Sequence, residues 1–275
     1  SFSNKTDSGL TIGGKLEIDA DANAQDESVL TISGGFGTFR LGQEDSMHES
    51  FGITEVDLID EEGDGRFVGT ATHTISGNAG EQGSTDTNKI AYVTPAMGGF
   101  KAGYSVMDSG TATQSTDQTA MGASYTMPMA GGSLMIRYNK QTTDGTTATE
   151  TEGSNYGVKV TMGAFSAIAS RGESTIGSGT GQSDDRIADG IGIKYDLGGG
   201  MTIAATTMKA EDDKDVSGTQ NEEYSANLAE VVYTVAPGLK AKVTYLDYDY
   251  KRGGETAAAS NDSGSKTQLT LSASF

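Results

Sequence analysis

The sequence has no cysteine, no tryptophan and only three prolines, and no run of apolar residues approaches the length of a membrane-spanning helix. The lack of cysteine excludes a disulfide scaffold and a Cys-ligated metal site. The lack of a long apolar run excludes a transmembrane helix. Cations are also scarce, with 19 Lys and Arg against 38 Asp and Glu and a net charge of −19. Such a chain lacks the basic face that binds nucleic acid.

The chain does have apolar residues that recur at every second position, which is a period of two. Apolar residues make up only 35% of it, which is low for a globular core, but they are regularly spaced. Leu10, Ile12, Leu16 and Ile18 alternate with polar or small residues, and the same pattern recurs to the last residue. This period is typical of strands with one apolar and one polar face. The chain is therefore predicted to be all-β.

About fourteen strands are predicted, most of them longer than the five or six residues usual in soluble sheets. They lie near residues 9–19, 28–34, 36–43, 88–94, 99–107, 118–127, 132–140, 154–163, 165–171, 186–196, 201–209, 223–235, 239–249 and 266–275. Short turns, which hold all three prolines, alternate with long polar connections. An up-and-down meander would place all the short turns at one rim and all the long loops at the other.

The strand lengths suit a bilayer crossing, which needs about nine to eleven tilted residues. A sheet of fourteen strands leaves a lumen that side chains do not fill, so apolar residues facing lipid and polar residues facing water fit the pattern. A soluble sandwich or solenoid is the alternative. Tyrosines at fixed distances from the turns predict a ring at each membrane interface. The two rings comprise Tyr92, Tyr125, Tyr195 and Tyr233 near the short turns, and Tyr104, Tyr138, Tyr156 and Tyr245 near the long loops.

Several stretches resemble the general-diffusion porins of Gram-negative outer membranes, particularly the alphaproteobacterial type. They are TDSGL at 6–10, GFGTFRLG at 35–42, NKIAYVTP at 88–95 and YDLGGG at 195–200, together with the terminal Phe275. Phe275 resembles the signal that the outer-membrane assembly machinery reads. The resemblance implies a single β-barrel domain over residues 1–275, placed in the outer membrane among lipid and lipopolysaccharide.

The resemblance also implies a homotrimer of sixteen-stranded barrels, each narrowed by an infolded third loop. The match begins near Phe2, at the end of the family's second strand. The complete protein is therefore expected to have sixteen strands, with the first hairpin missing from this chain. A barrel of fourteen strands is the alternative, because even numbers close equally well.

The longest connection, residues 44–87, corresponds to that third loop and is expected to form the constriction. Its acidic residues are Glu55, Asp57, Asp60, Glu61, Glu62 and Asp64. Strand parity places a basic wall opposite, with Lys15 and Arg40 as the first candidates and Arg137 and Lys159 next. Lys101, Lys194, Lys240 and Lys242 are expected nearer the short-turn rim. Carboxylates opposite cations in a narrow aqueous passage would create a transverse field that hinders apolar solutes.

No cofactor is expected, although the loop carboxylates Asp60, Glu62 and Asp64 could hold Ca²⁺. The segment is not an EF-hand, because Ala71 stands where the bidentate Glu would be and no helices flank it. Catalysis finds little support. The histidines, His48 and His73, lie in one loop without a recognisable nucleophile. The chain is therefore not expected to be an enzyme.

The leading hypothesis is a water-filled channel for passive diffusion of small hydrophilic solutes and ions. One alternative is a structural or adhesive surface barrel with a blocked lumen. Another is a porin selective for one substrate. Conductance in a planar bilayer separates the first two, and competition between a solute and the ion current reveals the third.

Overall fold

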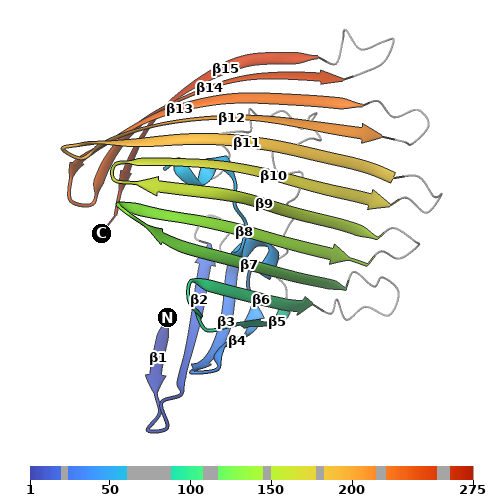
Figure 1. Ribbon diagram of the computed structural model, residues 1–275, viewed down its shortest axis with the longest axis vertical. Helices are drawn as coiled ribbons and strands as arrows, with labels where there is room; N and C mark the ends of the chain where they lie inside the picture. Colours follow the sequence, from blue (N-terminus) through green and yellow to red (C-terminus); the bar gives the residue numbers. More distant parts are fainter. Residues whose placement is uncertain are drawn as a thin grey trace.

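The computed structural model describes residues 1–19, 24–60, 88–107, 117–144, 150–177, 183–214, 221–252 and 261–274. These form one sheet of fifteen antiparallel strands, each hydrogen-bonded to the next along the chain (Figure 1). The first eight are β1 (Phe2–Lys5), β2 (Thr11–Asp19), β3 (Ala24–Gly34), β4 (Gly37–Gln43), β5 (Asn88–Val93), β6 (Phe100–Met107), β7 (Gln118–Met129) and β8 (Gly132–Thr143). The others are β9 (Thr151–Met162), β10 (Phe165–Gly177), β11 (Ser183–Gly198), β12 (Met201–Lys214), β13 (Glu222–Ala236), β14 (Leu239–Arg252) and β15 (Asp262–Ala273).

The sheet confirms the predicted all-β, up-and-down architecture, with one strand more than the pattern shows. The additional strand is β1, whose four residues pair with β2 from Phe2 opposite Gly14 to Lys5 opposite Thr11. Four residues are too few to display a period of two. Within the described residues the strand order runs linearly from β1 to β15, without pairing between these two strands.

Several strands continue beyond their predicted ends into connections that look polar in the sequence. β10 reaches Gly177 and β12 reaches Lys214, whereas the alternation of apolar residues stops near residues 171 and 209. Their last residues carry outward-facing ion pairs, among them Arg171 with Glu173 at 2.8 Å. Cross-strand pairing therefore extends past the apolar part of the sheet, where charge replaces hydrophobic contact.

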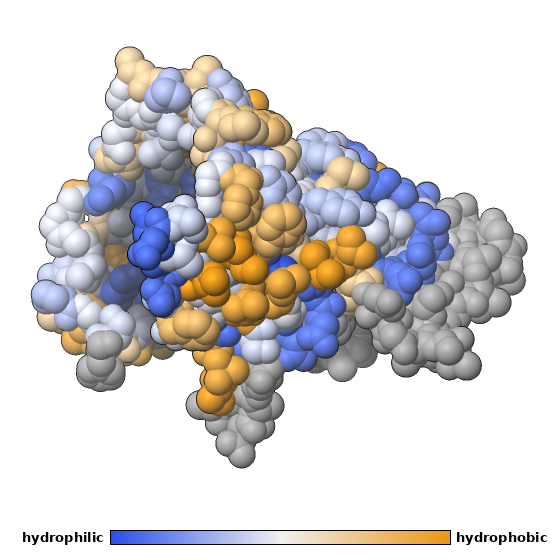
Figure 2. Space-filling model, turned by 90° about the horizontal axis from the view of Figure 1, so that it is seen from below, coloured by the Kyte–Doolittle hydropathy of each residue, from blue (hydrophilic) through white to orange (hydrophobic). Residues whose placement is uncertain are grey.

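The convex, outward face of the sheet carries the apolar side chains. A band of hydrophobic residues crosses the middle of the face seen in Figure 2, with hydrophilic residues beside it. Seven of the eight tyrosines predicted to form the two rings are exposed on this face, and Tyr92 is half-buried against Phe39, with ring centroids 4.9 Å apart. This distribution suits a lipid-facing surface with amphipathic rings at its edges.

The short turn that joins β11 to β12 runs through three consecutive glycines. Gly198, Gly199 and Gly200 have φ angles of +76°, +63° and +83°. Only glycine adopts this left-handed region without steric cost, so the turn needs this sequence. The N–H of Gly198 also donates to the Asp196 carboxylate at 2.8 Å, which closes the turn.

Residues 44–60 lie on the concave face of the sheet, called the lumen face here. They form two short helices, α1 (Met47–Ser50) and η1 (Glu55–Leu58), which Figure 1 shows inside the curl of the strands. No helix among the described residues is long and apolar enough to cross a membrane.

The lumen face is less polar than the alternation predicts. On β11 to β14 it carries a buried apolar cluster, called the inner cluster, against which Ile59 packs. Its members are Ala188, Met208, Ala210, Tyr224, Ala226, Leu228, Leu246, Tyr248 and Tyr250. The expectation that polar residues line the lumen does not hold for this part of β11 to β14, where the face carries apolar side chains against which Ile59 packs.

The division between the two faces gives a first prediction. Val158 lies on the outward face of β9 between Ile136 and Ala169, its register partners on β8 and β10. Val158→Arg should lower the free energy of unfolding from lipid vesicles by about 2–4 kcal/mol, because it places a charge in the apolar band. The control is Thr161→Arg on the lumen face of the same strand. Equal losses in the two variants would contradict this assignment of faces.

Candidate functional site

The beginning of segment 44–60 is fixed to the lumen face by side chains of β6 and β8. The Ser46 hydroxyl donates to Gln141 Oε1 at 3.0 Å and accepts the N–H of Glu49 at 3.4 Å, so it caps α1 as well. The backbone N–H of Met47 donates to Ser105 Oγ at 3.0 Å. These bonds are largely buried, and removing a partner would leave a polar group unsatisfied.

The middle of the segment bonds to β8 and β9. Arg137 donates from Nη1 to the carbonyl of Gly52 at 2.7 Å, and Asn155 Oδ1 accepts the N–H of Ile53 at 2.9 Å. Asn155 is itself held by Asn139, whose Oδ1 accepts the Asn155 N–H at 3.0 Å. Two wall residues thus take up backbone groups that would otherwise be buried without partners.

Glycines on the lumen face make room for the segment. A Cβ on Gly103 would lie 2.6 Å from Met47 Sδ, and one on Gly192 would lie 2.9 Å from the carbonyl oxygen of Glu55. Cβ atoms on the other members would meet Phe51, Ile53 and the Glu55 carboxylate. We call this set the glycine track: Gly103, Gly122, Gly157, Gly190 and Gly192. It lets the segment lie directly against the strand backbones.

Asp60 fixes the far end of the described segment to β13 and β14. Its carboxylate accepts hydrogen bonds from Lys240 Nζ at 3.1 and 3.0 Å, and its carbonyl accepts one from Lys242 Nζ at 2.7 Å. Its N–H donates to Glu230 Oε1 at 2.8 Å. Segment 44–60 therefore crosses the lumen face from β4 to β14.

The predicted constriction acids divide into three groups. Glu55 is 2% exposed and lies over Gly190, Asp57 is exposed and accepts the N–H of Thr54 at 3.2 Å, and Asp60 binds Lys240. Glu61, Glu62 and Asp64 lie outside the described residues. Of the three described acids, two thus face the wall that the segment covers. The transverse field across the passage stays a prediction.

The predicted basic wall is engaged differently from the expectation. Lys15 pairs with Glu17 and, at 2.6 Å, with Glu27, while Arg40 pairs with Glu44 at 3.1 Å. Lys15 thus meets acids on its own strand and on the neighbouring β3, and Arg40 meets the acid at the start of segment 44–60, rather than the predicted loop acids.

The other two wall residues behave differently from each other. Arg137 serves as a backbone anchor through Gly52. Lys159 is half-buried on β9, with no salt bridge among the described residues. Lys240 and Lys242, expected to shape an exit vestibule, instead hold Asp60.

Glu44 lies where β4 passes into the segment and is almost fully buried. Burial raises the pKa of its carboxyl group, while neighbouring Arg40 opposes that shift. Its backbone carbonyl accepts a hydrogen bond from the buried Lys89 at 2.8 Å. The start of segment 44–60 therefore combines a buried acid with two cations.

The structure leaves two further predictions untested. Within the described residues no group of three or more His, Asp or Glu side chains is arranged to hold a metal ion. The predicted Ca²⁺ ligands Glu62 and Asp64 lie outside those residues, and the Asp60 carboxylate is bound to Lys240. Phe275 also lies outside the described residues.

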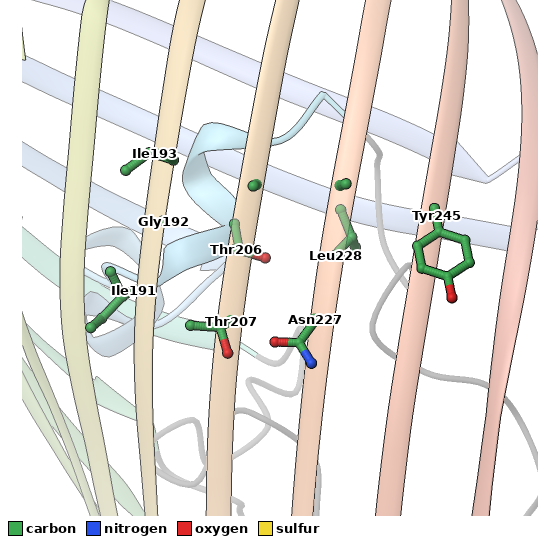
Figure 3. A pocket seen from close by; sticks show the side chains of 10 residues that line it. Ile191, Gly192, Ile193, Thr206, Thr207, Asn227, Leu228 and Tyr245 are labelled. Carbon is green, nitrogen blue, oxygen red and sulfur yellow. The ribbon is translucent and has the colours of Figure 1, made fainter.

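A shallow groove of about 490 Å³ lies on the sheet over β11 to β14 (Figure 3). It exists because Ala205 and Ala229 are small, while Ile193 and Tyr245 are larger neighbours at its sides. Because most of its lining faces outward, away from segment 44–60, it is not a site for solutes passing through the lumen.

Reasoning from the sequence missed the wall residues that hold the segment. Gln141, Asn139 and Asn155 carry buried amides, and Ser105 a buried hydroxyl, on the lumen face. Amides and glycines on the polar register of long strands are the signal that could have found them. A lumen exposed only to water has no need of either.

Comparison with known proteins places this geometry in a family. The profile of the Gram-negative porin family matches residues 1–274. The outer membrane porin protein 32 of Delftia acidovorans is 37% identical over 82 residues, which span 30% of this chain and 23% of that protein.

Solved structures show the same fold at low identity. The anion-selective porin from Comamonas acidovorans has a TM-score of 0.68 and 17% identity, covering 98% of this chain and 85% of that one. The outer-membrane protein OmpT of Vibrio cholerae has a TM-score of 0.70 and 11% identity, covering 98% and 86%. The outer membrane channel DcaP of Acinetobacter baumannii has a TM-score of 0.66 and 15% identity, covering 99% and 83%.

The glycine track gives a second prediction. In Gly190→Ala the new Cβ would collide with the Glu55 carboxylate, so the free energy of unfolding should fall by about 1–3 kcal/mol, as in other overpacked sites. Gly35→Ala is the matched control, because a Cβ there meets nothing within 4 Å. Denaturant unfolding in detergent measures both. A loss no larger than that of the control would show that segment 44–60 does not rest on β11.

Glu44 gives a prediction about pH. The pKa of the Glu44 carboxyl group is raised in the folded protein, so folding favours its neutral form. The stability that this neutral carboxyl contributes is lost as pH rises above the pKa that the group has in the unfolded chain. Relative to Glu44→Gln, the wild-type protein should therefore lose stability as pH rises from about 4 to 7. Unfolding midpoints of the two proteins at each pH test this. A stability difference that does not change with pH would contradict it.

Proposed function

Because this chain belongs to the family of Gram-negative porins, we propose that it forms a passive channel across the outer membrane for small hydrophilic solutes and ions. One observation carries this proposal. A sheet with an apolar band and exposed tyrosines on its convex face holds residues 44–60 on its concave face. Such a surface suits lipid outside, and a chain segment on the inner wall narrows the space inside.

The proposed mechanism needs no energy source. Solutes would follow their concentration gradient through the space that segment 44–60 leaves open. Charged side chains on the lumen face, among them Lys101 and Lys194, would favour hydrated and dipolar solutes, because an apolar solute gains nothing there for the water it loses. The acids Glu61, Glu62 and Asp64 would add to this field if the rest of the loop also lies in the passage.

Residue placement supports a channel rather than an enzyme. Within the described residues, His48 belongs to α1 and is buried at 2% exposure. This position serves packing of the segment and leaves no access for a substrate. The proposed role of the site is to set the width and charge of a passage.

Assembly and subtype belong to the same proposal. Family resemblance supports a homotrimer surrounded by outer-membrane lipid and lipopolysaccharide. The alphaproteobacterial subtype rests on the motifs at 6–10, 35–42, 88–95 and 195–200, while the curated relative comes from Delftia acidovorans. Native mass measurement in detergent would determine the number of subunits.

The channel proposal is tested with purified, folded protein in a planar bilayer. The wild-type protein should give stable open-channel current, whereas a structural or adhesive barrel with a blocked lumen would give none. Swelling of liposomes in sugars of increasing size would then measure the exclusion limit. A correctly folded protein without current would overturn the proposal.

Asn155→Ala tests whether segment 44–60 limits the passage. The change removes the acceptor for the Ile53 N–H without altering charge, so the segment should lose one anchor and the mean single-channel conductance should rise. Ser154→Ala, the adjacent change on the other face of β9, should leave conductance as in the wild type. Equal conductance in all three proteins would show that the segment does not limit the current.

A further inference from the structure

Six cations lie on the lumen face at one height of the sheet. They are Lys101 on β6, Arg137 on β8, Lys159 on β9, Lys194 on β11, and Lys240 and Lys242 on β14. We call them the cationic belt. Strand parity in the sequence places four of them near the short-turn rim, and the register between strands brings Arg137 and Lys159 to the same part of the sheet.

Strand register places these residues together. Lys101 pairs with Ser124, and Ser124 pairs with Arg137, so the cations of β6 and β8 share one row. Arg137 pairs with Gly157 on β9, and Lys159 follows two residues closer to the short turn. The row therefore continues toward the short turns, as expected for strands that tilt across a bilayer.

The short-turn tyrosine ring supplies an independent measure of height. Lys101 directly follows Phe100, which is the register partner of the ring residue Tyr125. Lys194 directly precedes the ring residue Tyr195. On β14, Lys242 pairs with Val232, the residue before the ring residue Tyr233. The belt therefore lies just inside the membrane interface at the short-turn end.

Half of the belt is occupied by segment 44–60. Arg137 binds the Gly52 carbonyl, Lys240 binds the Asp60 carboxylate and Lys242 binds the Asp60 carbonyl. A backbone carbonyl carries no net charge, so the bond to Gly52 does not neutralise Arg137. Its positive charge still contributes to the field at this height.

The other half has no salt bridge within the part of the chain that the structure describes. Lys101 is exposed, and Lys159 and Lys194 are half-buried. The lumen-facing acids at this height are few. Asp60 and Glu230 contact one another, and Asp196 accepts the N–H of Gly198 in its turn. Among the residues that the structure describes, six cations therefore face three acids at this height.

The part of the lumen face toward the long loops has the opposite balance of charge, with more acidic than basic side chains. Glu17 and Glu27 share Lys15, Glu44 pairs with Arg40, and the buried Asp212 pairs with Arg186 at 3.2 Å. The buried Glu222 lies near the long-loop end of β13. Among the described residues, these five acids face four cations there, Lys15, Arg40, Arg186 and the buried Lys89, whereas cations outnumber acids at the short-turn end.

Distance decides which charges a permeating ion experiences. At about 0.1 M salt the Debye length is about 10 Å, while a strand of about ten residues spans roughly 30 Å. Acids at the long-loop end and outside the barrel are therefore largely screened at the height of the belt. Low-dielectric walls strengthen the field of charges that line a narrow passage.

We propose that the cationic belt makes the channel prefer small anions, such as solutes that carry a carboxylate or a phosphate, although the whole chain carries −19. The preference rests on the proposed channel function. Lys101, Lys159 and Lys194 are the residues that determine it, because they form no salt bridge with an acidic side chain among the described residues. Net charge alone would predict the opposite preference.

The test is the reversal potential of the folded protein in a planar bilayer under a KCl gradient. The wild-type channel should pass Cl⁻ more readily than K⁺. In the triple variant Lys101→Gln, Lys159→Gln, Lys194→Gln, the ratio of Cl⁻ to K⁺ permeability should fall several-fold. At 1 M salt, where the Debye length is about 3 Å, the wild-type preference should weaken.

The matched control removes three outward lysines, as Lys140→Gln, Lys209→Gln, Lys251→Gln. These lysines pair with Glu152, Glu211 and Asp249 on the convex face, so the control changes net charge equally without touching the lumen. Its reversal potential should equal that of the wild type. If the lumen triple does not fold, Lys101→Gln alone, at an exposed position, should shift the potential in the same direction.

The outcomes separate this inference from the proposed function. A wild-type channel that prefers K⁺ would overturn the belt while leaving the channel intact. Equal reversal potentials for the lumen and control variants would do the same. A folded wild-type protein that carries no current would overturn both the channel and the belt.

Discussion

The structure depends on the need to satisfy every backbone polar group in a region without water. A strand in lipid gains hydrogen bonds only from neighbouring strands, so each strand must pair on both sides along its apolar length. Consecutive antiparallel pairing achieves this with the shortest connections. The period of two in the sequence follows directly, because each strand then has one face toward lipid and one toward the lumen.

The same requirement explains the wall beneath segment 44–60. Non-helical backbone inside a barrel needs partners for its N–H and C=O groups, and water is excluded where the segment touches the wall. Ser105, Asn155 and Arg137 provide those partners. The glycine track brings the segment close enough to reach them. Close approach and polar satisfaction are therefore two parts of one solution, and neither would hold the segment without the other.

Much of the fold could be predicted from the sequence, because lipid imposes a simple pattern on the outward face. The strands, their alternating connections and the exposed tyrosines all follow from that pattern. The strand β1 could not be found, since four residues are too short to display it. The partners of Lys15 and Arg40 could not be found either. Strand parity assigns a side chain to a face, but ion pairs depend on register between strands, which parity does not supply.

On β14, the positions of the apolar residues along the strand indicate which part of its inward face packs against protein. The number of polar residues in the strand does not. On β14, Val243 and Tyr245 face outward, and then Leu246, Tyr248 and Tyr250 face inward. The apolar positions shift by one residue at this point while the strand continues without a register break. A strand that only separates lipid from water has no reason to shift its apolar positions.

Such a shift marks the height at which the inward face packs against protein instead of water. Ile59, just before the Asp60 anchor, packs against the inner cluster, so the marked position lies close to where the described part of the segment ends. Cations at one height of the lumen face differ in this respect: Lys240 and Lys242 hold Asp60, whereas Lys101 is exposed and has no salt bridge among the described residues. The shift of apolar positions on β14 therefore marks wall that supports the segment, while strand parity alone does not separate the cations that hold the segment from those that solutes meet.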